Sequence, residues 1–109
     1  MSRLVSYSAG SIIAKEGEAA RKLFFLVEGR IGIYKSNKLI TEFDKEGEIV
    51  GEMSLILKKP RTAEIRSVTD SKLLEVEGDL DDIVRQYPDI SKKIIKALAE
   101  RLAKATDRF

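Results

Sequence analysis

Hydrophobic residues recur along the first two thirds of the chain in short runs that are separated by glycine or polar residues. The runs are rich in Ile, Val, Leu, Phe and Thr, which is typical of β-strands. Strands this short and numerous must pack sheet on sheet, so the pattern predicts an antiparallel barrel or jelly roll. The predicted strands are residues 11–14, 23–28, 30–35, 38–43, 62–68 and 72–77.

Two turns follow from the residues between these runs. Gly29 separates the second run from the third, and Ser36-Asn37 separates the third from the fourth, so we expect tight hairpins at both places. Asn37 tolerates the positive φ that such a turn requires. Apolar side chains alternate with more polar ones along 30–35 and 38–43, which predicts one buried face and one wetter face in each strand.

The pattern changes to helical after Gly78. Asp79 is a candidate N-cap for a short helix that ends at Tyr87, and Pro88 opens a second helix that runs to about residue 108 without Gly or Pro. Apolar residues in the second helix follow spacings of three and four, and an adjacent apolar row is expected to pack on the strands. The first row is Ile95, Leu98, Leu102, Ala105 and Phe109, and the adjacent row is Ile90, Ile94 and Ala97. The first row spans only two heptads and offers a surface for a possible homodimer.

Composition favours one folded domain over residues 1–109, with strands over about 3–78 and the helical part over about 79–109. The chain contains no Cys and no His, which excludes disulfides, thiol nucleophiles, Ser-His-Asp triads and Cys or His zinc sites. We therefore expect no metal and no enzymatic activity. Neither a signal peptide nor a membrane span is visible, so a cytoplasmic protein with no membrane partner is expected.

Charge argues against nucleic-acid binding by this chain alone. Twenty basic and 18 acidic residues leave a formal charge of +2, and they are interspersed along the chain. Lys58, Lys59 and Arg61 form the one basic cluster, which is too small for a set of backbone phosphate contacts.

The segment 51–65, GEMSLILKKPRTAEI, carries the candidate chemistry. Glu52 can accept a hydrogen bond from a sugar hydroxyl, Arg61 can bind two phosphate oxygens with its planar fork, and main-chain amides after Gly51 can point at the same anion. Taken singly, Glu52 could be an ordinary solvated carboxylate and Arg61 a surface ion-pair residue. Together they indicate a small phosphate ester with one negative charge and a free hydroxyl.

This segment resembles the phosphate-binding cassette of the cyclic nucleotide-binding domain family, which includes the catabolite activator protein and the protein kinase A regulatory subunit. The order Tyr7-Ser8-Ala9-Gly10, then 25–29, then the helix from Pro88 also matches this family. The residues that carry the cassette resemblance are Gly51, Glu52, Met53, Ser54 and Leu55, followed by Pro60, Arg61, Thr62 and Ala63.

The resemblance implies a mainly β fold, an antiparallel jelly-roll β-barrel (double-stranded β-helix) with short flanking helices and a C-terminal helix. It implies a non-catalytic sensor that needs no cofactor and whose ligand is a 3′,5′-cyclic nucleotide. Glu52 would bind the ribose 2′-hydroxyl and Arg61 the cyclic phosphate. Met53 and Ser54 would contribute main-chain groups, while the side chains of Met53 and Leu55 are expected to fill core.

The base is left open, with cAMP favoured over cGMP. A hydroxyl at Thr62 could reach the phosphate or the 2-amino group of a syn guanine, as in some relatives. Residues of the C-terminal helix often cap the base in this family, and Leu98, Leu102 or Thr106 are the candidates here.

In transcription-factor members a linker and a helix-turn-helix domain follow, so we expect either a Crp/Fnr-like regulator with output beyond Phe109 or a free-standing sensor. The main rival interpretation is a structural dimerisation module whose nucleotide site is not used. A complete DNA-binding regulator and a nucleotide-processing enzyme are weaker rivals. The chain has no P-loop, and Asp79, Asp81 and Asp82 are explained by a helix start.

Overall fold

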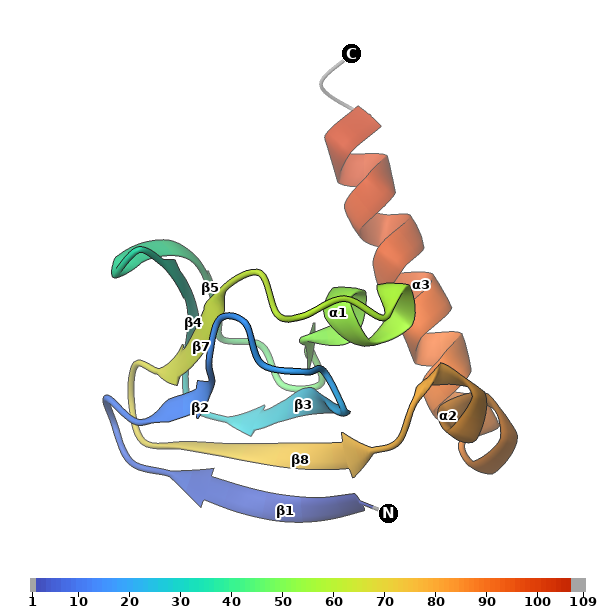
Figure 1. Ribbon diagram of the computed structural model, residues 1–109, viewed down its shortest axis with the longest axis horizontal. Helices are drawn as coiled ribbons and strands as arrows, with labels where there is room; N and C mark the ends of the chain where they lie inside the picture. The colour runs from blue at the N-terminus through green and yellow to red at the C-terminus, as the bar shows by residue number, and fades with distance from the viewer. Residues whose placement is uncertain (1, 107–109) are drawn as a thin grey trace.

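The computed structural model describes residues 2–106, which form two four-stranded antiparallel sheets and three helices (Figure 1). The fold is therefore mainly β and antiparallel, as the sequence predicted. In the first sheet the strand order is β1 (Ser2–Tyr7), β8 (Ser71–Glu77), β3 (Lys22–Glu28), β6 (Ile49–Val50). In the second sheet the order is β2 (Ile12–Ala14), β7 (Glu64–Ser67), β4 (Ile31–Lys35), β5 (Lys38–Phe43).

Two hydrophobic clusters hold the sheets and helices together. The first lies between the two sheets and draws side chains from both of them. The second lies between the first sheet and the helices. The buried members of the first cluster are Ala14, Phe24, Leu26, Ile31, Val50, Ile65 and Leu73, and those of the second are Leu23, Phe25, Ile49, Leu55, Val76, Ile83 and Ile94.

One of the two predicted hairpins is confirmed and the other is wrong. Ser36 and Asn37 have φ values of 49° and 65°, and they join the paired strands β4 and β5. Gly29 does not close a hairpin, because β3 and β4 belong to different sheets and pair with other strands. Gly29 has φ of 97°, and a Cβ there would lie 2.5 Å from the Asp70 main-chain oxygen, so this crossing requires glycine.

Edge strands account for the remaining differences from the predicted strands. β1 was not predicted, because its residues are exposed or half-buried and give no apolar alternation. β5 was predicted correctly in extent, but its predicted buried face is wrong, because Leu39 is 49% exposed, Thr41 is exposed and Phe43 is only half-buried. Because β5 is an edge strand, it packs less of its surface than an interior strand does.

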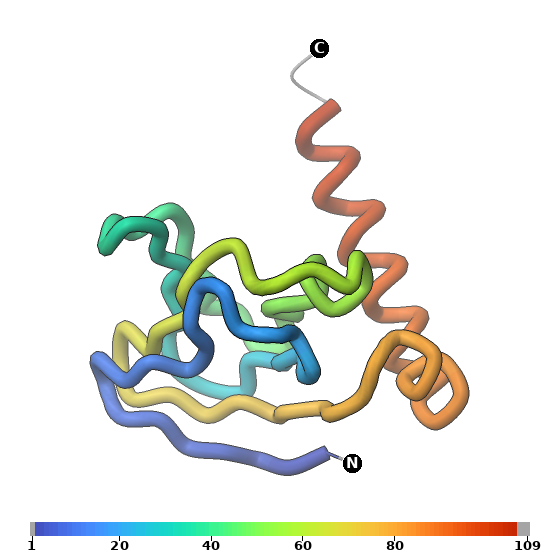
Figure 2. Tube along the Cα trace, viewed as in Figure 1, coloured from blue at the N-terminus to red at the C-terminus, as the bar shows by residue number. Residues whose placement is uncertain are grey.

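The helices begin and end close to the predicted residues. α1 (Glu52–Leu57) follows β6, α2 (Leu80–Gln86) follows β8, and α3 (Pro88–Thr106) completes the described chain. The first half of α3 packs through Ile94, which is 3% exposed, as predicted. The C-terminal end of α3 extends away from the strands (Figure 2), and Phe109, the last residue of the predicted apolar row, lies outside the described residues.

Asp79 caps α2 in a reciprocal arrangement with Asp82. The Asp79 side chain accepts a hydrogen bond from the Asp82 amide at 2.9 Å, and the Asp82 side chain accepts one from the Asp79 amide at 3.2 Å. The hydrogen bond from the Asp82 main chain lowers the pKa of Asp79 below its ordinary value of 3.8. The cap therefore favours the ionised form of Asp79.

The stabilisation from this cap should depend on pH. A depressed pKa in the folded state contributes stability above the unfolded pKa, and this stability is lost as the pH falls through the folded value. We expect Asp79→Ala to lower the thermal midpoint at pH 7 by more than at pH 2.5, measured by circular dichroism. An equal loss at both pH values would mean that the carboxylate charge does not contribute.

Candidate functional site

Gly51 sets the direction in which α1 leaves β6. It occupies the N-cap position with φ of 83°, a left-handed conformation that side chains other than that of glycine rarely adopt. No side chain caps α1, so its first main-chain amides are left available to an external acceptor. This turn places the start of α1 at the mouth of a cavity.

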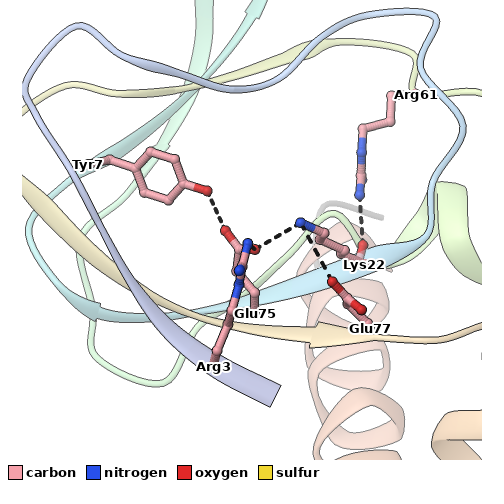
Figure 3. Close-up of polar contacts among 6 residues, drawn as sticks. All are labelled: Arg3, Tyr7, Lys22, Arg61, Glu75 and Glu77. Carbon is pink, nitrogen blue, oxygen red and sulfur yellow. Dashed lines mark hydrogen bonds and ion pairs between the residues drawn. The ribbon is translucent and has the colours of Figure 1, made fainter. Parts of the chain in front are cut away.

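Arg61 is held in place at both its main chain and its side chain. Its amide donates to the Glu18 oxygen at 2.8 Å, and its own carbonyl accepts from the Gly17 amide at 2.7 Å. Its Nη1 donates to the Gly51 oxygen at 3.1 Å, and its Nη2 donates to the Lys22 oxygen at 2.7 Å, a bond that Figure 3 also shows. A guanidinium has five N–H donors, so the remaining ones are available to a ligand.

Burial makes this guanidinium a strong anion site. Arg61 is 5% exposed, and its Cζ lies 5.4 Å from the centre of the Phe24 ring. Loss of water around the side chain lowers the pKa of Arg61, and the nearby Glu18 partly opposes this shift. An arginine remains protonated at neutral pH. Because Arg61 is buried, little water screens its positive charge.

Gly51 and Arg61 also depend on each other sterically. A Cβ on Gly51 would lie 2.7 Å from Nη1 of Arg61 and 3.3 Å from Cδ2 of Phe24. We expect Gly51→Ala to displace the guanidinium and to weaken anion binding by about tenfold, beyond a modest loss of stability. Titration calorimetry and thermal melting measure both quantities. Gly47→Ala is a suitable control, because Gly47 also has positive φ (88°) but has open space around its Cβ position.

Glu52 is buried and is bonded to the C-terminal helix. The residue is 3% exposed, and its Oε1 accepts a hydrogen bond from Nη1 of Arg101 in an ion pair. Arg101 also donates from Nη2 to the Ile49 oxygen at 2.8 Å, and its Cζ lies 5.6 Å from the Phe43 ring centre. One side chain of α3 therefore contacts β5, β6 and α1 together.

These residues surround a cavity of about 170 Å³. All seven predicted site residues line it, so the structure brings the two ends of the segment 51–63 together. They are Gly51, Glu52, Met53, Ser54, Arg61, Thr62 and Ala63. The wall is completed by Ile33, Phe43, Val50, Ile65 and Arg101, which the sequence did not point to as site residues.

One expectation about side chains needs correction. Leu55 is 2% exposed and fills core as predicted, but Met53 is 62% exposed and does not. On α3, Arg101 lines the cavity, and contact of Leu98, Leu102 or Thr106 with the base stays a prediction.

The sequence did contain a signal for Arg101. Ile90, Ile94, Ala97 and Arg101 follow spacings of four, three and four, which places them on one helix face. The first three pack against the strands and the other helices, so the fourth position of this row faces the same way. A charged residue at the end of a core-facing row indicates a buried polar partner.

Within residues 2–106, no cluster of three or more acidic residues is placed to bind a metal ion. No helix in the same range combines the length and the apolar character needed to cross a bilayer.

Comparison with known proteins identifies the family. A model described as the cyclic nucleotide-binding domain matches residues 4–87. The Pycsar effector protein XpPycTIR of Xanthomonas perforans is 30% identical over 102 residues, covering 92% of this chain but only 33% of that protein.

Solved structures agree with this assignment. The catabolite activator protein of Thermus thermophilus shares the jelly-roll fold with a TM-score of 0.79 at 24% identity, covering 98% of this chain and 53% of that one. A cAMP-bound PfPKA-R is 29% identical with a TM-score of 0.73, covering 98% of this chain and 36% of that one. The predicted family is confirmed: the chain belongs to the cyclic nucleotide-binding domain family.

Proposed function

We propose that residues 1–109 form one non-catalytic sensor domain of the cytoplasm that binds a 3′,5′-cyclic nucleotide, with cAMP preferred over cGMP. The observation that carries this proposal is the convergence of two buried charged side chains, Glu52 and Arg61, on one cavity. Burial of a carboxylate and a guanidinium is costly unless a partner is provided, and a nucleotide offers a partner to each.

The charges around the cavity match a phosphodiester. The lining contains one carboxylate, Glu52, and two guanidiniums, Arg61 and Arg101. Because Glu52 and Arg101 pair with each other, Arg61 supplies the one unbalanced positive charge. A cyclic phosphate carries a single negative charge, so it suits this lining better than the dianion of a nucleoside monophosphate does.

From the contacts within the site we infer which part of the ligand each residue binds. Only Oε1 of Glu52 accepts a bond from a described side chain, so Oε2 can accept one from the ribose 2′-hydroxyl. The unused N–H groups of Arg61 and the main-chain amides of Met53 and Ser54 would hold the phosphate. Thr62 and Ala63 complete the wall beside it.

The preference for cAMP has one line of support outside this chain. A structural relative at 29% identity was solved with cAMP bound. Within the chain, Thr62 is an exposed residue of the cavity lining, and its hydroxyl could instead contact the amino group of a guanine. A titration with both nucleotides decides between them.

The small volume of the cavity suggests how nucleotide binding changes the contacts of α3. Pockets for small molecules begin at roughly 300 Å³, which exceeds the 170 Å³ found here. Arg101 is the lining residue that α3 contributes. Because its side chain is 39% exposed, it is the part of the cavity wall that can move outward. We infer that an entering nucleotide displaces Arg101 and thereby loosens its bonds to Glu52 and Ile49.

This coupling predicts a result for Arg101→Met. Hydrogen exchange of amides 99–106 should change when nucleotide binds to the unaltered chain, because Arg101 anchors that end of α3. In Arg101→Met the anchor is absent from the outset, so we expect most of the nucleotide-dependent change to disappear. Lys104→Met, an exposed substitution on the same helix, should preserve it. A full nucleotide response in Arg101→Met would rule out this route.

The unpartnered face of α3 supports a homodimer as the unit of signalling. Ile95 and Leu102 are 69% and 66% exposed, and both belong to the apolar row predicted from the sequence. The chain spans a third of the Xanthomonas protein that it resembles, so the process that the domain regulates is a separate proposal. We propose either a Crp/Fnr-like regulator or a free-standing sensor that acts on a partner.

The rival function is a dimerisation module whose nucleotide site is unused. Isothermal titration calorimetry with cAMP, cGMP, cCMP and cUMP separates the two, with Arg61→Ala as the matched control. The sensor proposal expects saturable 1:1 binding of at least one of them, strongest for cAMP, and its loss in Arg61→Ala. No heat with any of the four, together with a stable dimer in sedimentation, would favour the rival.

A further inference from the structure

Glu75 is a buried carboxylate that the nucleotide cavity does not use. It is 1% exposed, yet it lies in β8 and is absent from the cavity lining. A buried carboxylate is costly unless several donors satisfy it. We therefore ask which groups satisfy the Glu75 carboxylate and what else they bind.

Two strands, β1 and β3, supply the donors to Glu75 (Figure 3). Tyr7 of β1 donates its hydroxyl to Oε2, and Lys22 of β3 donates from Nζ to Oε1 at 3.0 Å. Nη2 of Arg3 on β1 lies 3.8 Å from Oε1. Burial, together with the bond to Glu75, raises the pKa of Tyr7, so its hydroxyl stays protonated and remains a donor.

Lys22 connects this network to the nucleotide site. Its side chain binds Glu75, while its main-chain oxygen accepts the 2.7 Å hydrogen bond from Nη2 of Arg61. Lys22 is the first residue of β3, and its register partner Glu77 is the last residue of β8. The carbonyl that orients Arg61 therefore lies at a strand end, where a backbone frays most easily.

We propose that Glu75 and Lys22 are positioning residues for Arg61. The ion pair fixes the start of β3, and the fixed Lys22 carbonyl holds one nitrogen of the guanidinium while Gly51 holds the other. A guanidinium that is already oriented loses less conformational freedom when it binds an anion. This inference rests on the proposed function for its effect on affinity, but the orientation of Arg61 is testable without any ligand.

The experiment compares three variants of the whole chain. Lys22→Met keeps the length of the side chain and removes its charge, and Glu75→Gln removes the charge of the partner. Lys22→Arg retains a cation that can still reach Glu75 and serves as the conservative rescue. We expect the first two to weaken cAMP binding by roughly five- to tenfold and Lys22→Arg to stay within about twofold of the unaltered chain.

The side-chain NMR signals of Arg61 provide a readout that a merely structural role would not move. Hydrogen bonds from both terminal nitrogens slow rotation of the guanidinium, so its Nη–H signals should be resolved in the ligand-free chain. The signals are assigned by their disappearance in Arg61→Lys. We expect them to broaden or vanish in Lys22→Met and in Glu75→Gln, and to persist in Lys22→Arg.

Two controls separate positioning from general destabilisation. Glu28→Gln removes an exposed ion pair, Lys72 to Glu28 at 3.6 Å, between the same two strands. Leu73→Val trims a fully buried side chain two residues from Glu75 and lowers stability without touching the network. Both should retain the Arg61 signals and the affinity for cAMP.

Each outcome bears on the proposal. Resolved Arg61 signals in Lys22→Met or Glu75→Gln, or losses no larger than in Leu73→Val, would overturn it. If the unaltered chain binds no cyclic nucleotide, the proposed function fails, whereas selective loss of the Arg61 signals would still support the positioning role.

Discussion

Arg61→Lys is expected to weaken cyclic nucleotide binding by more than about tenfold, although the positive charge is retained. An ammonium is a point donor without a planar fork, so it cannot bond Gly51, Lys22 and two phosphate oxygens from one rigid group. It also loses the stacking of the guanidinium over Phe24. Titration calorimetry at a fixed ionic strength gives the change in Kd.

Arg66→Lys is the matched control for this substitution. Arg66 is partly buried and, like Arg61, lies over an aromatic ring, with its Cζ 4.4 Å from the Tyr34 ring centre, and it pairs with Glu64. It does not line the cavity, so its replacement should leave Kd within about twofold. Equal losses in the two variants would show that the effect does not come from contact with the phosphate.

Glu52→Gln is expected to weaken binding by about ten- to a hundredfold, which corresponds to about 1.5–3 kcal/mol for a hydrogen bond to a charged group. The amide is a poorer acceptor for the ribose hydroxyl than the carboxylate is. The substitution also leaves the Arg101 guanidinium without its counter-charge beside the cavity. Glu46→Gln, an exposed change in the segment before β6, should have little effect.

The 2′-deoxy form of the preferred nucleotide isolates the hydroxyl contact. The unaltered chain should bind the deoxy ligand about as weakly as Glu52→Gln binds the normal one. Combining the two changes should then cost little more, because the same interaction has already been lost. Fully additive losses would contradict a direct contact between Glu52 and the sugar.

Local pattern was enough to predict the fold class and most elements. The strand from Lys38 to Phe43, the turn at Ser36-Asn37 and the start of α2 at Asp79 depend on neighbouring residues, and the structure agrees with each. β1 and the crossing at Gly29 depend on which distant strand becomes the partner. Exposed edge residues carry no apolar alternation that could predict such a choice.

The part of the candidate site that lies in one continuous segment was predicted from the sequence. Glu52 and Arg61 lie nine positions apart in a recognisable motif, and the structure brings both to one cavity. Arg101 and Glu75 contribute through contacts across 49 and 53 positions of the chain. Glu75 looks like an ordinary surface residue in the sequence, because only tertiary packing decides its burial. Arg101 is marked only by its place at the end of a core-facing row of the last helix.

A crystal structure of the chain soaked in saturating cAMP tests the central claim most directly. The account predicts a cyclic phosphate within hydrogen-bonding distance of the Arg61 guanidinium, and a ribose hydroxyl on the Glu52 carboxylate with Arg101 displaced from its present position. A cavity that stays empty at saturation, with Arg101 still bonded to Glu52, would contradict it.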